Sequence, residues 1–256
     1  MKVTILGCGT SGGVPQVGLG WGDCDPDEPR NRRKRASVLV EEGGQTILVD
    51  TGPDCREQLL MADVKRLDAI FYTHAHADHC HGIDDLRWLC HVMGEAIEVY
   101  GDALTLQQLQ ERFDYCFTPL DPRANRYYYK PVLNPNEIKG PVKIGPVKVT
   151  AFDQDHGHSI TLGYRFGGFA YSTDVVRLND AAFDALADVD TWVVDALQPH
   201  EHPTHAHLER TLEWIDRVKP RRAILTHMNT RMDYQWLVNN LPDGVEPAFD
   251  GMILDI

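Results

Sequence analysis

The sequence contains no apolar run long enough to cross a membrane, and its basic residues are outnumbered by its acidic ones. A transmembrane helix needs about 20 consecutive apolar residues, so we expect no membrane partner. The 256 residues include 25 Lys and Arg against 38 Asp and Glu, which gives a formal net charge of −13. A negative field of this size disfavours long nucleic acids as partners.

Cysteine is also scarce, and its six positions show no regular spacing. Residues 1–6 read as a strand that leads into a glycine-rich loop, without the longer apolar core and cleavage site of a signal peptide. In a chain without an export signal, free thiols are expected rather than disulfides. We therefore expect a cytoplasmic protein.

No internal repeat, low-complexity segment or Ser/Gly/Pro-rich linker divides the chain. The hydrophobic content of 43% is enough for a sizeable core. Residues 1–256 are therefore predicted to form a single domain, and a homodimer is compatible with this composition.

Short apolar runs of strand type alternate with amphipathic stretches along the chain. Strands are predicted at 3–6, 36–41, 45–49, 69–73, 97–100, 147–152, 161–166, 168–173, 191–195 and 222–226. Helices are predicted at 54–62, 82–93, 103–114, 179–187, 205–218 and 233–240. This mixture of hairpins and strand–helix units predicts an α/β fold with mixed sheets.

Residues 7–12, Gly-Cys-Gly-Thr-Ser-Gly, match the dinucleotide-binding pattern G-x-G-x-x-G after a strand. That pattern must open a helix, but Gly13 and Pro15 follow at once, and a helix cannot propagate through them. We expect instead a loop whose backbone N–H groups are free for a phosphate or for an ordered turn.

The segment with the most chemistry is residues 74–79, His-Ala-His-Ala-Asp-His, directly after the apolar run 69–72. Imidazole and carboxylate together suit zinc, manganese or iron. Because Asp78 and His79 are adjacent, they cannot both point where His74 and His76 point. The spacing therefore favours two neighbouring metals over one.

Further residues of metal-ligand type stand at the ends of other apolar runs: Asp50, His156, Asp174 and His227. In this order, and over nearly the whole chain, the motifs resemble the metallo-β-lactamase superfamily. The resemblance implies a four-layer αββα sandwich of two mixed sheets, and two divalent metal ions per chain, zinc or manganese.

The resemblance also implies a role for each residue. One metal would be held by His74, His76 and His156, the second by Asp78, His79 and His227, with Asp174 as a bridge. Asp50 would accept a hydrogen bond from a metal-bound histidine, and Asp78 is expected to be catalytic as well as a ligand. The superfamily places its ligand seven residues before Gly163, which selects His156 and leaves His158 as a neighbour or substrate contact.

A second histidine cluster occupies residues 202–208, His-Pro-Thr-His-Ala-His-Leu, ahead of a predicted helix. Phosphodiesterases of this superfamily carry a catalytic His at such a junction, and counting from Thr211 selects His205. An imidazole there would protonate a leaving alkoxide. The alternative is a capping or exposed His, and His207 is the second candidate for the acid or for a substrate contact.

Two other segments are candidates for substrate contact. The basic run at residues 30–35, which includes Arg33, is either a solvated loop or a rim that guides a phosphate. Residues 115–137 form a long connection with three consecutive tyrosines, which either closes over a substrate or packs on the fold.

The glycine-rich start, residues 49–54 and residues 225–228 look like the phosphoribosyl 1,2-cyclic phosphodiesterase subgroup. The resemblance implies hydrolysis of a phosphodiester in a small molecule, a cyclic ribose phosphate or a nucleotide, by a hydroxide between the metals with His205 as general acid. That subgroup has a further structural zinc, but this chain keeps only Cys24 of its cysteines and has Thr230 in place of its histidine. We therefore expect no structural zinc.

Three other functions remain open. A tRNA 3′-processing endonuclease shares the whole constellation but normally has a protruding RNA-gripping arm. A glyoxalase-type thioester hydrolase has no need of a proton donor such as His205. A non-enzymatic metal or nucleotide sensor is a third alternative.

Overall fold

The computed structural model describes residues 1–119 and 130–256. The run of three tyrosines in the predicted substrate lid lies outside these described residues. Two seven-stranded sheets account for the strands of the described chain. The first has the order β14 (Ile253–Asp255), β1 (Lys2–Gly7), β2 (Ser37–Glu42), β3 (Gln45–Val49), β4 (Ala69–Phe71), β5 (Ile97–Gly101), β6 (Leu133–Glu137). The second has the order β13 (Val245–Pro247), β12 (Arg222–Thr226), β11 (Thr191–Asp195), β10 (Phe169–Ser172), β9 (Ile160–Phe166), β8 (Val147–Asp155), β7 (Val142–Ile144).

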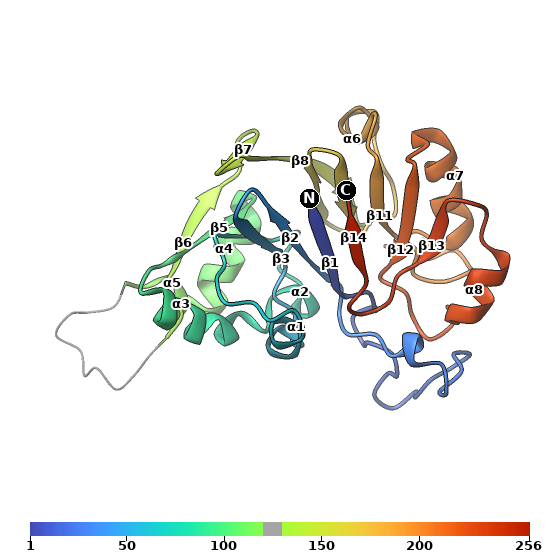
Figure 1. Ribbon diagram of the computed structural model, residues 1–256, viewed down its shortest axis with the longest axis horizontal. Coiled ribbons are helices and arrows are strands. Elements are labelled where there is room, and N and C mark those ends of the chain that lie inside the picture. Colours follow the sequence, from blue (N-terminus) through green and yellow to red (C-terminus); the bar gives the residue numbers. More distant parts are fainter. Residues whose placement is uncertain (120–129) are drawn as a thin grey trace.

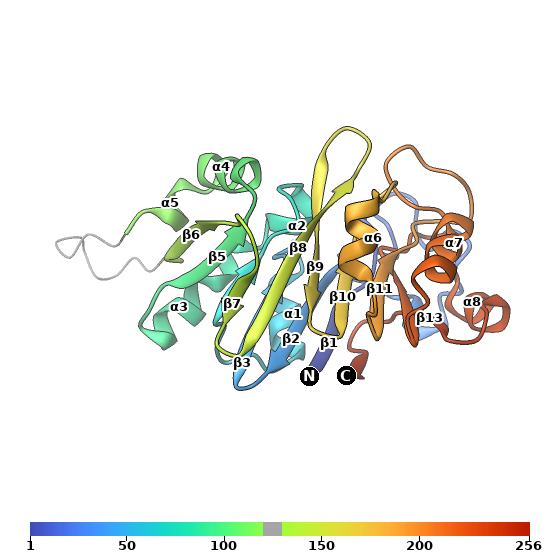
Figure 2. The same cartoon turned by 90° about the horizontal axis from the view of Figure 1, so that it is seen from above.

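Both sheets are mixed, as predicted. In the first, β1, β2 and β3 pair antiparallel, whereas β3 to β6 pair parallel. In the second, β7 to β10 pair antiparallel, and β10 to β13 pair parallel. Figures 1 and 2 show the two sheets face to face with helices outside them, which is the αββα arrangement.

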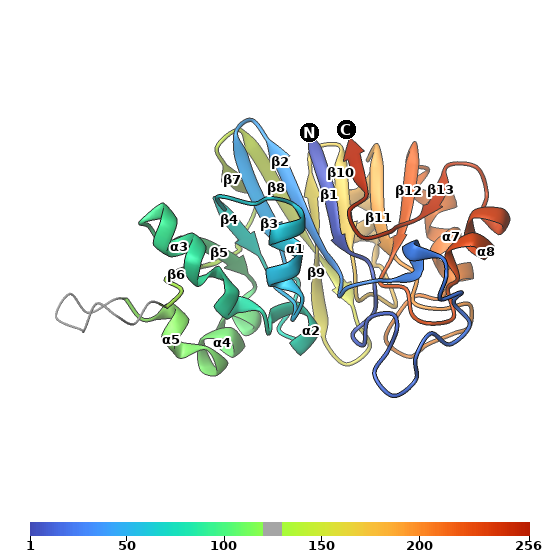
Figure 3. The same ribbon diagram turned by 60° about the horizontal axis from the view of Figure 1, so that its bottom comes forward.

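The helices follow the strands in short connections. They are α1 (Cys55–Met61), α2 (Ala77–Cys80), α3 (Arg87–Met93), α4 (Ala103–Arg112), α5 (Asp114–Phe117), α6 (Asp180–Leu186), α7 (Leu208–Val218) and α8 (Tyr234–Asn240), with 3-10 turns η1 (Pro29–Asn31) and η2 (Ile83–Leu86). Figure 3 shows α1 and α3 beside the first sheet and α7 and α8 beside the second.

Strands β1 to β4 of the first sheet are buried on both faces over most of their length, which explains their continuous apolar runs. On β2, Val38 and Val40 pack into the cluster between the sheets, while Leu39 packs with the helices outside. On β4, Phe71 points inward and Ile70 points outward in the same way. The period-two alternation of a strand thus distributes one apolar run between two cores.

The sequence predicted ten of the fourteen strands of the described chain and missed β6, β7, β13 and β14. The helix predicted at 205–218 begins only at Leu208, because His207 at its N-terminal cap is extended, with φ −92° and ψ 165°. The backbone N–H of Ala206 donates to Val175 O at 2.6 Å instead of joining a helix. The histidine cluster is therefore a loop fixed against the sheet.

No helix follows β1, in agreement with the rejection of a dinucleotide site. Gly13 has φ +64°, and the chain continues through turns instead. The N–H of Gly9 donates to Lys34 O at 2.7 Å, and that of Thr10 donates to Met228 O at 3.2 Å. The glycine-rich loop is thus held between two distant segments.

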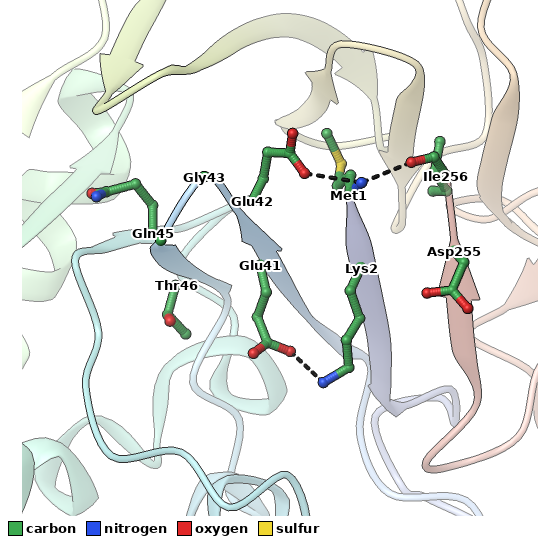
Figure 4. A pocket seen from close by; sticks show the side chains of 10 residues that line it. Met1, Lys2, Glu41, Glu42, Gly43, Gln45, Thr46, Asp255 and Ile256 are labelled. Carbon is green, nitrogen blue, oxygen red and sulfur yellow. Dashed lines mark hydrogen bonds and ion pairs between the residues drawn. The ribbon is translucent and has the colours of Figure 1, made fainter.

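The two chain ends meet beside the β2–β3 turn (Figure 4). The Met1 ammonium group donates to Ile256 O at 2.7 Å and pairs with Glu42 at 2.9 Å. A cavity of about 700 Å³ opens there, but neither His nor Cys is among its lining residues, so it offers no imidazole or thiolate for metal chemistry. Within the described residues, no helix has the length and apolar character needed to span a bilayer.

Candidate metal centre and active site

The predicted site residues follow the carboxyl ends of strands in both sheets. Asp50 follows β3, His74 comes shortly after β4, His156 follows β8, Asp174 comes shortly after β10 and His227 follows β12. Since β3 and β4 are parallel, and β10 to β12 are parallel, these ends meet at one edge of each sheet. Chain segments far apart in sequence therefore deliver polar side chains to one volume.

Three of these residues turn the chain sharply. Asp50, Asp174 and His227 have φ of 64°, 54° and 58°, in the left-handed region that non-glycine residues rarely occupy. Backbone strain of this kind is retained at functional sites. Asp50 and His227 come directly after the last residue of β3 and β12, and Asp174 comes two residues after the end of β10.

The first ligand cluster consists of His74, His76, His156 and Asp174, whose donor atoms all lie within 4.8 Å of one another. His74 Nε2 lies 2.8 Å from His76 Nδ1. Asp174 Oδ2 lies 3.7 Å from His74 Nε2 and 3.6 Å from His156 Nε2. His156 therefore belongs to the cluster.

The second cluster consists of Asp78, His79, Asp174 and His227, with the same limit of 4.8 Å. His79 Nε2 lies 3.2 Å from Asp78 Oδ2 and 3.1 Å from Asp174 Oδ1. His227 Nε2 lies 3.3 Å from Asp174 Oδ1. Asp174 thus presents Oδ2 to the first cluster and Oδ1 to the second, which is the placement of a bridging carboxylate.

Hydrogen bonds at Nδ1 fix the tautomers of the buried histidines. Asp50 Oδ2 accepts from His79 Nδ1 at 2.7 Å, and Thr204 O accepts from His156 Nδ1 at 2.7 Å. Thr73 Oγ1 donates to Asp50 Oδ2 at 2.8 Å, so it accepts from His74 Nδ1 at 3.0 Å. With Nδ1 as the donor in each ring, Nε2 is the nitrogen that faces the cluster and is available to a metal.

The electrostatics of the site also fit a bound cation. Burial raises the pKa of Asp78 and Asp174, but the facing imidazoles, above all His79 and His227, outweigh it and hold both pKa values well below the usual range. Buried His79 Nε2 and both ring nitrogens of His227 have no hydrogen-bond partner among the described residues. Unpaired buried donors and acceptors are costly, and a divalent metal such as zinc or manganese is the partner that this donor set suits.

His205 lies beside the two clusters. Its ring centroid is 4.8 Å from that of His156 and 4.7 Å from that of His227, and its Nε2 is 3.9 Å from Asp174 Oδ2. Asp195 Oδ2 accepts from its Nδ1 at 2.9 Å. Burial lowers the pKa of the His205 imidazole, but the Asp195 carboxylate outweighs this and raises it to about 9.

Asp195 is a site residue that sequence analysis missed. It ends β11 in the same way as the other acids end their strands, and this position was the signal that could have found it. The carboxylate is fully buried, and its Oδ2 also accepts from Val175 N at 3.0 Å.

Arg112 was missed as well. From the end of α4 it donates through Nη1 to Ala75 O, between the predicted ligands His74 and His76, and Cys80 Sγ donates to the same oxygen at 3.6 Å. No local pattern marks a helix-end arginine for this contact.

The remaining predicted residues are placed as follows. His158 lines a cavity of about 400 Å³ over the clusters, together with Ser11, Ser159 and Thr204. His207 is the N-terminal cap of α7 and is not among the lining residues. Arg33 needs a correction: its side chain is only 2% exposed, and its guanidinium donates to Met232 O at 2.6 Å instead of reaching the cavity.

A comparison with known protein families matches residues 45–228 to the family described as "Beta-lactamase superfamily domain". The chain belongs to this superfamily. The solved structure of a diphosphatase from the PhnP family shares 33% sequence identity and a TM-score of 0.91, covering 100% of this chain and 97% of that one. The fold class and the metallo-β-lactamase resemblance are thereby confirmed, and the chain has the residue set of a metal-dependent hydrolase.

Two curated proteins that are similar to this chain have different names. An octanoyltransferase of Porphyromonas gingivalis is 31% identical over 98% of this chain and 51% of its own length. A ribonuclease Z of Rippkaea orientalis is 30% identical over 58% of this chain and 44% of its own length. The chain thus spans about half the length of the curated relatives it matches.

Proposed function

We propose that the protein is a dinuclear metal-dependent phosphodiesterase that acts on a small phosphate ester, a cyclic ribose phosphate or a nucleotide. His74, His76 and His156 would hold one zinc or manganese ion, Asp78, His79 and His227 the other, and Asp174 would be shared. Metals bound there would supply positive charge for the phosphoryl oxygens and a water with a lowered pKa.

The observation that carries the proposal is the His205–Asp195 pair. Asp195 holds the proton on His205 Nδ1, orients the ring and favours its protonated form. The ring edge with Nε2 stands at the cavity, next to the bridging carboxylate. A proton donor in this position supports cleavage of an ester whose leaving group is a poor one, such as a ribose hydroxyl.

The cavity supports a small substrate. Its volume of about 400 Å³ is within the size class of small-molecule sites. The ribonuclease Z relatives favour RNA as the second candidate substrate, but the net charge of −13 opposes an extended RNA contact. The octanoyltransferase name does not settle the matter, because the chain spans only about half of that relative.

The test is a substrate panel with the zinc- and manganese-loaded protein. It contains a cyclic ribose phosphate, a 2′,3′-cyclic nucleotide, bis-p-nitrophenyl phosphate, a thioester and a tRNA precursor. We expect the highest kcat/KM on one of the small ribose phosphodiesters. Preferred cleavage of the tRNA precursor would replace the proposal with the nuclease, and preferred cleavage of the thioester would replace it with the glyoxalase type.

The role of His205 is tested in the same panel. His205→Ala should lower kcat on the ribose ester by about 10²–10⁴-fold, the usual contribution of a general acid. The loss should be much smaller on bis-p-nitrophenyl phosphate, because p-nitrophenolate leaves without a proton. His207→Ala is the matched control, and a larger loss in that variant would move the acid to His207.

A further inference from the structure

Arg33 carries a buried charge that the proposed chemistry does not use. Its side chain is 2% exposed, and within the described residues it forms no ion pair with a carboxylate. Burying a charge without an ionic partner is expensive. The contacts of the Arg33 guanidinium therefore indicate which part of the structure the buried charge stabilises.

Those contacts converge on the turn that follows the ligand His227. Nη2 donates to Met232 O at 2.6 Å, and Nη1 donates to Asn229 O at 3.3 Å. Nη2 also reaches Asn31 Oδ1 at 3.3 Å, and the same Oδ1 accepts from Tyr234 N at 2.7 Å, at the start of α8. One planar guanidinium thus joins both ends of the turn at residues 229–232.

The backbone of Arg33 holds the opposite side of the site. Its N–H donates to Val14 O at 2.9 Å, and Val14 N donates back to Arg33 O at 2.9 Å. This pairing fixes the glycine-rich loop, from which Ser11 lines the cavity. Arg33 therefore links that loop to the turn after His227.

His227 depends on such a link more than the other histidines do. His74, His79, His156 and His205 each have an acceptor at Nδ1, whereas both ring nitrogens of His227 lack a hydrogen-bond partner among the described residues. Its ring is therefore placed by its backbone, which is in the left-handed region, and by stacking on the His205 ring. That backbone is held through Met228 N to Cys8 O at 2.9 Å, Thr10 N to Met228 O at 3.2 Å and Asn229 N to Leu197 O at 2.9 Å, and the turn at residues 229–232 follows directly.

We propose that Arg33 is a positioning residue for His227: its guanidinium fixes the turn at residues 229–232 and thereby does for His227 what an Nδ1 acceptor does for each of the other histidines. The inference rests on the proposed metal centre but not on the proposed substrate. Its consequence is selective: loss of Arg33 weakens the metal held with His227 and spares the metal held with His74, His76 and His156.

The experiment compares Arg33→Met and Arg33→Lys with Arg32→Met as the matched control. Arg32 is the exposed neighbour, with its guanidinium 5.1 Å from the ring centroid of Trp21. The two zinc dissociation constants are measured by chelator competition, and amide hydrogen exchange is measured on the zinc-free proteins. His227→Ala and His76→Ala identify which zinc belongs to which cluster.

In Arg33→Met we expect one zinc to bind about 10–100-fold more weakly, the usual effect of losing a residue that orients a ligand, and the other to change by less than about threefold. Exchange in zinc-free protein should accelerate at 227–233 and stay unchanged at 156–160. Arg33→Lys keeps the charge but loses the planar fork of the guanidinium, so its zinc binding should fall between Arg33→Met and wild type. This variant carries the test if Arg33→Met does not fold. Adding Arg33→Met to His227→Ala should weaken zinc binding no further, whereas adding it to His76→Ala should be additive.

Equal weakening of both zinc sites, with faster exchange throughout, would mean a general loss of stability and would overturn the inference. Unchanged binding and exchange would overturn it too. A wild-type protein that binds fewer than two zinc ions would refute the proposed metal centre instead, and the exchange at 227–233 would still decide the role of Arg33.

Discussion

Replacing Asp50 with Asn should reverse the tautomer of a metal ligand with almost no change in shape. The buried Asp50 carboxylate accepts three hydrogen bonds, from Thr73 N at 2.8 Å, Thr73 Oγ1 at 2.8 Å and His79 Nδ1 at 2.7 Å. Asn, like Asp, tolerates the left-handed backbone of this position, with φ 64°. The substitution therefore tests the carboxylate rather than the backbone.

The magnitude follows from the position of one proton. If the Asn amide oxygen keeps the Thr73 N–H, its NH2 group faces His79 Nδ1, which must then become an acceptor. The proton moves to Nε2, which lies 3.1 Å from Asp174 Oδ1 and is no longer free for a metal. We expect the zinc held with His79 to bind at least about 10–100-fold more weakly, which corresponds to about 1.4–2.7 kcal/mol.

The assay is chelator competition for zinc together with urea unfolding of the zinc-free protein, and Asp50→Ala is the comparison. Asp50→Ala leaves three buried donors unpaired, each at a cost of about 1–3 kcal/mol, and should lower the free energy of unfolding far more than Asp50→Asn. If Asp50→Asn binds both zinc ions within about threefold of wild type, Asp50 does not set the tautomer of His79 and the reasoning fails.

Two further predictions concern the bridge and the dependence of stability on pH. Wild-type protein should contain about two metal ions per chain by elemental analysis. Because one carboxylate faces both clusters, Asp174→Ala should retain about one metal ion and lose at least about 10²-fold in turnover. An Asp174→Ala variant with both metals and full turnover would disprove the bridge. Burial raises the pKa of Asp250 to about 6, above its ordinary value of 3.8. The folded state thus binds this proton more tightly, and the resulting stability is present below the ordinary pKa and lost as pH rises through about 6. Between roughly pH 5 and pH 7.5, the free energy of unfolding of the zinc-free protein should fall by about 1.4 kcal/mol more in wild type than in Asp250→Asn. If the unfolding free energies of the two proteins change with pH in parallel, Asp250 does not have this role.

The sequence by itself determined where the strands end and which side chains stand there. Alternation between two apolar faces makes a strand such as β2 recognisable from local residues alone, and the metal-type residues Asp50, Asp174 and His227 each follow such a run. The order of these motifs resembled that of the metallo-β-lactamase superfamily, and that resemblance implied the two ligand clusters. The strands β6, β7, β13 and β14 were missed because polar residues or proline interrupt their short sequences, Leu-Asn-Pro-Asn-Glu, Val-Lys-Ile, Val-Glu-Pro and Ile-Leu-Asp, so no apolar run marks them.

Only the tertiary structure decided which residues support the ligands. Arg33 stood in a basic run that local sequence describes as a solvated loop or a phosphate rim, yet its guanidinium is buried against Met232, 199 positions away. Asp195 and Arg112 reach His205 and Ala75 through packing of separate elements. A local sequence pattern shows the hydrophobic periodicity and the chemical groups of a segment. Whether a charged side chain faces water, a carbonyl or an imidazole depends on the distant segment that packs against it. That neighbour is determined only when the two sheets pack together in the folded protein.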